Sequence, residues 1–253
     1  MKKIIKKIGN RLLPFINKTK TANRSYPIDN KTDLLNNFYQ ILKKIKFHPV
    51  HIIDVGANSG TWTREIIKYF PNAYYTLLEP QEWLKESIKD LLESNPKISF
   101  NIMGAGRVPG NMKFTLAHRD DSSSFRFSES EAIEQGLKQI EVPVVTLNEF
   151  IGNLSLPVPD IIKIDAEGFD LEVLKGATNY FGKTEIFLVE AAVVCKEIDN
   201  SLTNVVKFMD DNGYNLFEIT DMNRTASEKT LWLVELVFVK KNGFIDSIKF
   251  TYN

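Results

Sequence analysis

Two glycines and an acid follow the first two expected strands at a spacing that suits a nucleoside. Residues 51–60 run from an apolar strand directly into a helix, and Gly56 and Gly60 let the backbone approach a ligand at this turn. The spacing G-x-x-x-G lacks the third glycine of the dinucleotide fingerprint. Glu79 ends the second strand nineteen residues after Gly60, where a carboxylate can accept both hydroxyls of an unphosphorylated ribose and would repel a 2′-phosphate. The pattern therefore predicts a nucleoside site, with tight strand–turn–helix packing as the structural alternative.

A second group of acids follows the fourth expected strand. Residues 160–177 read DIIKIDAEGFDLEVLKGA, which indicates a strand, a turn and a helix. Asp165 stands where the strand ends, and an acid there faces the crevice in which doubly wound sheets bind ligands. Glu167 and Asp170 lie at the start of the helix, where the helix dipole alone could account for carboxylates. Asp165 is therefore the stronger candidate for a role in a site.

Short apolar runs alternate with amphipathic segments from residue 48 onward, a pattern typical of a parallel sheet covered by helices. We expect an α/β domain with seven mostly parallel strands and helices on both faces. The expected strands are 51–56, 74–79, 98–103, 160–165, 185–190, 214–219 and 233–240, and the expected helices are 61–70, 81–94, 169–180 and 201–212. The last two strands have no long helix between them, so we expect an antiparallel pair at one edge. Trp232, which leads the last strand, is expected to be structural.

A long insertion, residues 104–159, separates the third and fourth strands. It holds an expected hairpin arm at 112–118, a polar turn at 119–124 and a helical stretch near 129–139. So long a connection in a compact domain is more often functional than idle, and we expect it to overhang the sheet edge at which the strands end. The polar turn region carries His118, Ser122, Ser123 and Ser124.

Basic and acidic residues are equal in number, 32 of each, but unevenly distributed along the 253 residues. The first fifty hold twelve Lys or Arg and two Asp, a net charge of +10, so the other 203 carry −10. Overall neutrality argues against a general nucleic-acid binder. The single cysteine, Cys195, permits no intrachain disulfide and suits a reducing compartment. We expect residues 1–47 to be a basic, partly helical extension and residues 48–253 the main domain.

The basic N-terminus is amphipathic. On a helical wheel of residues 1–13, cations surround a narrow apolar arc, and Pro14 ends the helix. That arc consists of Ile4, Ile5, Ile8 and Leu12. Such a helix either packs on its own domain or a twin subunit, or lies on an anionic membrane surface through residues 1–20. No apolar run of 18 residues exists, so we expect a cytoplasmic protein, with peripheral contact at the inner membrane face as an open alternative.

Six segments, IDVGANSGTWT, LLEP, DSSSF, VPVVTLNEF, IIKIDAEGFDLEVLKGA and IFLVE, occur in one order over about residues 50–195. In the sequences and the order of these segments, the chain resembles the FkbM family of methyltransferases. The resemblance implies a Rossmann-like class I fold and an S-adenosylmethionine-dependent O-methyltransferase (EC 2.1.1.-). It implies cofactor contacts with Asp54, Gly56, Ala57, Asn58, Gly60, Glu79, Ala105 and Asp165. Many relatives carry an acid near the adenine where this chain has residues 104–106, GAG, so backbone amides are expected to serve there.

Methyl transfer to a hydroxyl needs a group that accepts the proton. The candidates for this base are Asp165, Glu167, Glu190 and His118, the last with a solvated loop histidine as its alternative. The first three could instead gather a divalent cation such as Mg²⁺, which prefers hard oxygen ligands. Ser122, Ser123 and Ser124 are expected to contact a polyhydroxylated acceptor, with a flexible turn as their alternative.

The resemblance thus implies methyl transfer to a sugar hydroxyl in polysaccharide biosynthesis, with a surface polysaccharide or another glycan as acceptor. A small natural product as acceptor, methylation at nitrogen, and a nucleotide- or nicotinamide-binding protein of another class are the alternatives. The expected partner is the hydroxyl acceptor and not nucleic acid, and a homo-oligomer is open.

Overall fold

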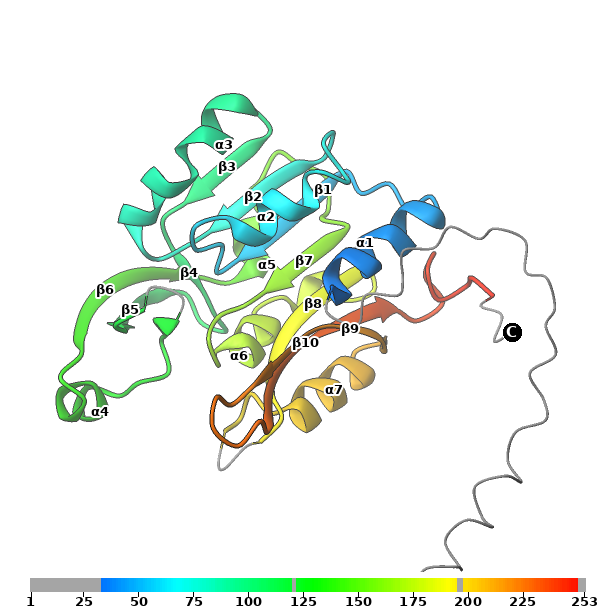
Figure 1. Cartoon of the computed structure of the whole chain (residues 1–253). Coiled ribbons are helices and arrows are strands. Elements are labelled where there is room, and N and C mark those ends of the chain that lie inside the picture. Colours follow the sequence, from blue (N-terminus) through cyan, green and yellow to red (C-terminus); the bar gives the residue numbers. More distant parts are fainter. Residues whose placement is uncertain (1–32, 120–121, 195–197, 250–253) are drawn as a thin grey trace, which may run out of the picture. The chain divides into compact units, whose positions relative to one another are not determined.

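The computed structural model describes residues 33–119, 122–194 and 198–249 (Figure 1). These described residues form one compact unit. The amphipathic helix expected near residues 1–13, the membrane contact expected through residues 1–20, and Cys195 lie outside the described residues. Among the helices that are described, none combines the length and the apolar character needed to cross a membrane.

Seven strands form the main sheet in the order β3-β2-β1-β7-β8-β10-β9 (Figure 1). They are β1 (His51–Val55), β2 (Tyr74–Leu78), β3 (Ile98–Asn101), β7 (Ile161–Ile164), β8 (Ile186–Ala192), β9 (Tyr214–Arg224) and β10 (Leu231–Lys240). The first five pair in parallel, whereas β10 is antiparallel to both of its neighbours, β8 and β9. The expected Rossmann-like sheet with one antiparallel C-terminal strand is therefore confirmed.

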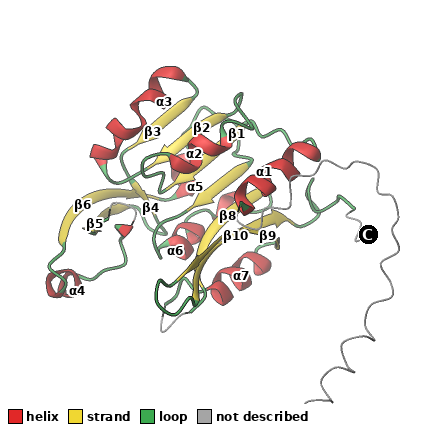
Figure 2. Ribbon diagram, in the orientation of Figure 1, coloured by secondary structure: helices red, strands yellow, loops and turns green. Residues whose placement is uncertain are grey.

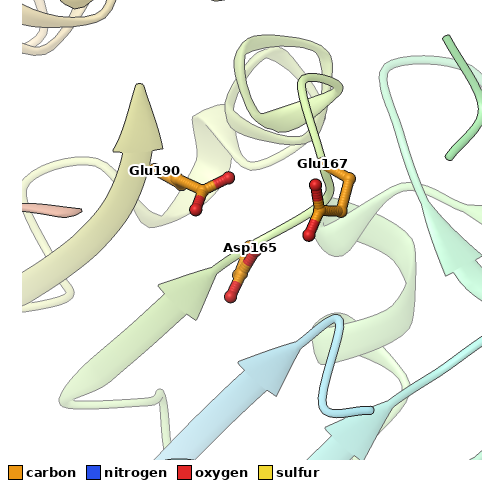
Figure 3. A group of neighbouring side chains, drawn as sticks. All are labelled: Asp165, Glu167 and Glu190. Carbon is orange, nitrogen blue, oxygen red and sulfur yellow. The ribbon is translucent and has the colours of Figure 1, made fainter. Parts of the chain in front are cut away.

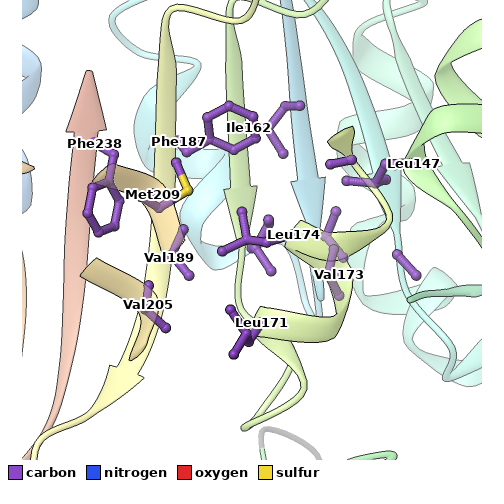
Figure 4. Packing of buried hydrophobic residues seen from close by; sticks show 14 of the residues in the cluster. Leu147, Ile162, Leu171, Val173, Leu174, Phe187, Val189, Val205, Met209 and Phe238 are labelled. Atoms are coloured by element: carbon purple, nitrogen blue, oxygen red, sulfur yellow. The ribbon is translucent and has the colours of Figure 1, made fainter. Parts of the chain in front are cut away.

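Helices cover both faces of this sheet (Figure 2) because successive strand residues point to opposite sides. One face is covered by α5 (Leu147–Gly152), α6 (Asp170–Lys175) and α7 (Leu202–Asp211). The other is covered by α1 (Leu34–Lys44), α2 (Thr61–Ile66) and α3 (Lys89–Ser94), with a 3₁₀ segment at Glu82–Ile88 before α3. Ile162, Phe187 and Phe238 contribute to the first core (Figure 4), and their neighbours Ile161 and Leu188 to the second.

Helix α1 belongs to the compact unit, whereas the sequence analysis assigned residues 1–47 to an extension. Asp33 caps it by accepting a hydrogen bond from the amide of Asn36 at 3.3 Å. Its residues Phe38 and Leu42 are fully buried against the sheet. The amphipathic face of α1 therefore completes the second core, and the boundary of the unit lies ahead of this helix.

The insertion forms a small sheet of its own, in the order β4-β6-β5. Its strands are β4 (Gly104–Ala105), β5 (Gly110–Leu116) and β6 (Lys138–Val145), and α4 (Glu129–Glu134) precedes β6. The expected hairpin arm is present as β5. The helix expected to reach residue 139 ends five residues earlier, since Gly136 adopts φ +66° and the chain turns into β6.

Candidate functional site

The loops after β1 and β7 meet at the edge of the sheet where the parallel strands end. The amides of Gly56 and Ala57 donate to the carbonyl of Leu78 at 2.9 and 3.1 Å, which ties the β1 loop to β2. Gly56 adopts φ +76°, and a Cβ there would lie 1.9 Å from the carbonyl oxygen of Asp165. Only glycine therefore allows the two loops to lie in direct contact.

Glu79 joins the loop after β1 to the loop after β2. Its carboxylate is 3% exposed and accepts from the amide of Asn58 at 2.8 Å, and from the amide and side chain of Gln81 at 2.9 and 3.2 Å. Burial raises the pKa of Glu79, and these hydrogen bonds oppose the rise. A carboxylate offers about four acceptor positions, so three are occupied and one remains for a ligand hydroxyl.

A first cavity lies between these loops and the insertion. It is lined by Val55, Gly56, Asn58, Leu78, Glu79, Pro80, Gln81, Met103, Gly104, Ala105, Phe114, Ser123, Phe125, Asp165, Ala166 and Glu167. Gly104 makes room for the Phe125 ring, which a Cβ would approach to 2.4 Å. The amide of Gly106 donates to the carbonyl of Val145 at 2.9 Å. Of the backbone amides of residues 104–106 that were expected to contact adenine, that of Gly106 is therefore already used within the fold. Ala105 is buried in the wall, as its place in β4 requires.

Three carboxylates come together where β7 and β8 end (Figure 3). One oxygen from each of Asp165, Glu167 and Glu190 lies within 4.8 Å of the others, and all three residues are half-buried. Burial, followed by the charges of Asp165, Asp170 and Glu167, raises the pKa of Glu190 to about 10. The raised pKa favours the protonated form of Glu190, which can donate a hydrogen bond.

Lys163 compensates part of this negative charge. It is 4% exposed, and its Nζ lies 3.0 Å from Oδ2 of Asp165 and 3.6 Å from Oδ1 of Asp54. Burial by itself would lower the pKa of Lys163, but the two carboxylates raise it above its usual value. Asp54 also accepts from the hydroxyl of Thr63 at 2.7 Å and is not itself among the residues that line the cavities. Sequence reasoning missed Lys163, although a lysine within an apolar strand and two residues before an acid was a visible signal.

Asp170 holds the loop that carries Glu167. It is fully buried, and its two oxygens accept from the amides of Ala166 and Gly168 at 3.0 and 3.1 Å and from the side chain of Asn200 at 2.9 Å. Burial raises the pKa of Asp170 to about 7, against the effect of these hydrogen bonds. Its position fits the structural reading of this acid.

Two further cavities open from the carboxylate cluster. The second, of about 580 Å³, is lined by Asp33, Leu34, Leu35, Gly56, Ala57, Asn58, Ser59, Thr61, Trp62, Glu65, Lys163, Asp165, Glu190, Thr220, Asp221 and Glu235. The third, of about 370 Å³, is lined by Ala117, His118, Ser122, Ser124, Arg126, Phe127, Gln135, Leu137, Glu167, Gly168, Glu190, Ala192, Ile198, Asn200, Trp232 and Leu233. Asp165 lies between the first and second cavities, Glu167 between the first and third, and Glu190 between the second and third. The three acids therefore stand where all three cavities meet.

Residues 122–126 form a partition between the first and third cavities. Ser123 and Phe125 line the first, whereas Ser122, Ser124 and Arg126 line the third. The segment is extended at Ser124, whose backbone pairs with Thr115.

The serine hydroxyls in this partition are partly used by the fold. Oγ of Ser124 donates to the carbonyl of Glu167 at 2.8 Å, and Oγ of Ser123 accepts from the amide of Ala117 at 3.1 Å. His118 is exposed at the rim of the third cavity, beyond the cluster of acids. The fold thus brings Asp165, Glu167 and Glu190 together and leaves His118 outside that cluster.

Comparison with known proteins identifies a family for this chain. A family model described as "Methyltransferase FkbM domain" matches residues 54–216. Among curated proteins, none matches the sequence.

Two solved structures show the level of structural likeness. A precorrin-6y C5,15-methyltransferase from Geobacter metallireducens has 16% identity and a TM-score of 0.44, and the match covers 80% of this chain and 87% of that one. TrmK from M. capricolum, solved with S-adenosylhomocysteine, has 10% identity and a TM-score of 0.46 over 80% of this chain and 68% of that one. At these values the likeness carries no argument about acceptor or mechanism.

Proposed function

The chain belongs to the FkbM methyltransferase family and is an S-adenosylmethionine-dependent methyltransferase, and from that premise we propose that its acceptor is a sugar hydroxyl in a glycan. The observation that carries the proposal is the meeting of three cavities at Asp165, Glu167 and Glu190. Two of them include the glycine loop expected to hold the cofactor, and the third, lined by polar groups of the insertion, is left for an acceptor.

The residues present fit the cofactor. Trp62 lines the second cavity and is 8% exposed, and within the described residues its indole nitrogen has no hydrogen-bond partner. A buried donor without a partner fits the carboxylate of a methionyl group. Glu79 keeps one acceptor position for a ribose hydroxyl, and the apolar wall at Met103 and Phe125 fits a flat base. Bound in this way, S-adenosylmethionine supplies the methyl group that is transferred.

Glu167 is the residue we propose as the proton acceptor. It is the only one of the three clustered acids that lines both the first cavity and the third. Glu190 also reaches the third cavity, but its raised pKa favours the protonated form, which can orient a hydroxyl by donating a hydrogen bond to it. Asp165, held by Lys163, lies on the cofactor side, where its charge can attract the sulfonium.

We propose that this route needs no divalent cation. Lys163 already lies 3.0 Å from Asp165 and brings a positive charge to the cluster. The three carboxylates could hold Mg²⁺ by their chemistry, and activity in excess chelator tests the choice. Activity retained in chelator supports general-base catalysis, whereas loss that Mg²⁺ restores supports the metal route.

We also propose where in the cell the enzyme acts. The net charge of +10 in the first fifty residues would hold it at an anionic membrane surface, near lipid-linked glycan precursors. A cytoplasmic location, contact through residues 1–20, the absence of nucleic-acid partners and a homo-oligomer remain predictions. Sedimentation with anionic vesicles tests the contact, because removal of residues 1–20 should abolish it.

The decisive experiment is transfer of a radiolabelled methyl group from S-adenosylmethionine to isolated host glycans. Glycans from cells with and without the active protein should differ by the mass of one methylene at a hydroxyl. Label that appears only in a small natural product, or on nitrogen, would overturn the glycan proposal while leaving the methyltransferase assignment intact.

A further inference from the structure

Trp232 stands at an irregularity in strand β10. Leu231 pairs with Arg224 of β9, and Leu233 pairs with the adjacent Asn223, so two steps along β10 match one step along β9. Trp232 is the extra residue of a β-bulge. Leu231 and Val234 both pack against the first core, although they are three positions apart, because the bulge restores the inward direction. Bulges of this kind redirect a side chain and are frequent beside active sites.

The bulge directs Trp232 into the third cavity. The side chain is 43% exposed and lines the cavity together with Glu167 and Glu190. Its backbone is fixed, since its carbonyl accepts from the amide of Val193 at 2.8 Å, just beyond the end of β8. The indole is therefore a large apolar surface on a fixed strand. The cavity that it lines is also lined by Glu167 and Glu190, which we propose to act on the acceptor hydroxyl. This differs from the purely structural role expected from the sequence.

The spacing between the indole and the acids suits a saccharide. Trp232 is level with Val193, three residues along β8 from Glu190, which corresponds to about 10 Å of strand. A ring can rest on the indole over that span while a hydroxyl of the same or the next ring reaches Glu167. The lining of the cavity also includes polar side chains, those of His118, Ser122 and Arg126.

We propose that Trp232 is the platform on which a pyranose ring of the acceptor stacks, and that it sets the preference of the enzyme for saccharides. The inference rests on the proposed glycan methylation and names the subsite that would recognise the glycan. The apolar C–H face of a pyranose lies flat on an indole, and its ring hydroxyls project sideways to polar groups. The cavity offers both surfaces at once, an aromatic face and a polar wall.

The test compares Trp232→Ala and Trp232→Phe with a matched control, Trp83→Ala. Trp83 is also exposed, at 47%, but lies in the 3₁₀ segment before α3, apart from the residues that line the three cavities. With a glycan that the wild type methylates, Trp232→Ala should raise KM for the acceptor about tenfold and change kcat less than about twofold. Trp232→Phe should recover most of the KM, and Trp83→Ala should match the wild type. Affinity for S-adenosylhomocysteine should be the same in all four proteins.

A second measurement separates this inference from the proposed function. Saturation-transfer NMR with methyl α-mannopyranoside and methyl β-glucopyranoside, in the presence of S-adenosylhomocysteine, reports ring contact without turnover. The wild type and Trp83→Ala should saturate C–H protons of one pyranose face, and Trp232→Ala should not. Pyranoside contact through Trp232 without glycan methylation would support the platform and overturn the proposed function.

Three outcomes overturn the platform itself. The first is an unchanged acceptor KM, or undiminished saturation transfer, in Trp232→Ala. The second is a wild type that contacts no pyranoside and methylates an aromatic natural product. The third is a change of oligomeric state in Trp232→Ala with acceptor binding intact, since this would make the exposed indole a subunit contact.

Discussion

Replacing Lys163 with methionine should destabilise the protein in a way that depends on pH. Lys163 and Asp54 have side chains only 5% and 1% exposed, so the substitution leaves the Asp54 carboxylate buried without its cation. Removing one partner of a buried pair costs about 3 to 5 kcal/mol. The Asp165 side chain is 34% exposed and can be solvated, so we expect the lower figure, about 3 kcal/mol at pH 7.

Protonation of Asp54 limits the size of this loss. From its ordinary pKa of 3.8, binding a proton at pH 7 costs about 4 kcal/mol, and at pH 5 it costs about 2 kcal/mol. Burial already raises the pKa of Asp54, and loss of Lys163, which lowers it, raises it further. A raised folded-state pKa adds stability that is fully present below pH 3.8 and is lost as the pH rises through the folded value. The deficit of the variant should therefore shrink as the pH falls from 8 to 5.

Urea unfolding of wild type and Lys163→Met at pH 5, 7 and 8 measures this deficit. Lys207→Met, which removes an exposed pair with Asp211, is the matched control and should leave the midpoint unchanged. The double variant Asp54→Asn with Lys163→Met should regain part of the loss, because the buried charge of Asp54 is then removed together with its cation. A deficit that is equal at pH 5 and pH 8, or below about 1 kcal/mol at pH 7, would refute the reasoning.

Three further predictions concern the site. Glu79→Ala should weaken S-adenosylhomocysteine binding at least about tenfold in calorimetry, since it removes the acceptor for the Asn58 amide as well as the ribose contact; unchanged affinity would contradict the ribose assignment. Glu167→Gln should lower kcat by about 10²- to 10⁴-fold with cofactor affinity intact, and a normal kcat in this variant would rule out Glu167 as the base. Asp165→Ala should also slow methyl transfer, although it leaves the proposed base in place. Glu190→Gln keeps a neutral side chain and should leave kcat at pH 7 within about threefold. The stability of the wild type relative to this variant should fall as the pH rises from about 4.5 through about 10, and a stability difference that does not change with pH would show that the pKa of Glu190 is not raised.

The sheet was predictable because its strands are apolar runs that end at polar residues. The small sheet of the insertion was harder to predict, since β6 includes Glu141 and Pro143 and is buried mainly on one side.

The helix expected over residues 169–180 ends at Lys175 in the fold. The next residue, Gly176, lies against the backbone of Gly106, to which a Cβ would come within 2.1 Å. That contact joins segments far apart in the sequence, so no local pattern could reveal it.

The candidate site was predictable in its acids and not in what surrounds them. Asp165 and Glu167 follow β7 and Glu190 lies near the end of β8, and the parallel topology brings residues at these positions together. Asp54 shares that position in the sequence but points behind its loop, because alternate residues of a strand face opposite sides. The direction of Trp232 depends on a bulge, which is fixed by pairing with β9 and leaves no mark in the sequence of β10.

The partition at residues 122–126 makes the length of this segment more important than its composition. Its odd-numbered residues line the first cavity and its even-numbered residues line the third. Inserting or deleting one residue would therefore turn the Phe125 side chain toward the third cavity or the Arg126 side chain toward the first. A substitution at one position alters one wall only. Redesign for another acceptor can therefore vary Ser122 and Arg126, but it must keep the number of residues in the segment and must keep Ser124, whose Oγ donates to the carbonyl of Glu167.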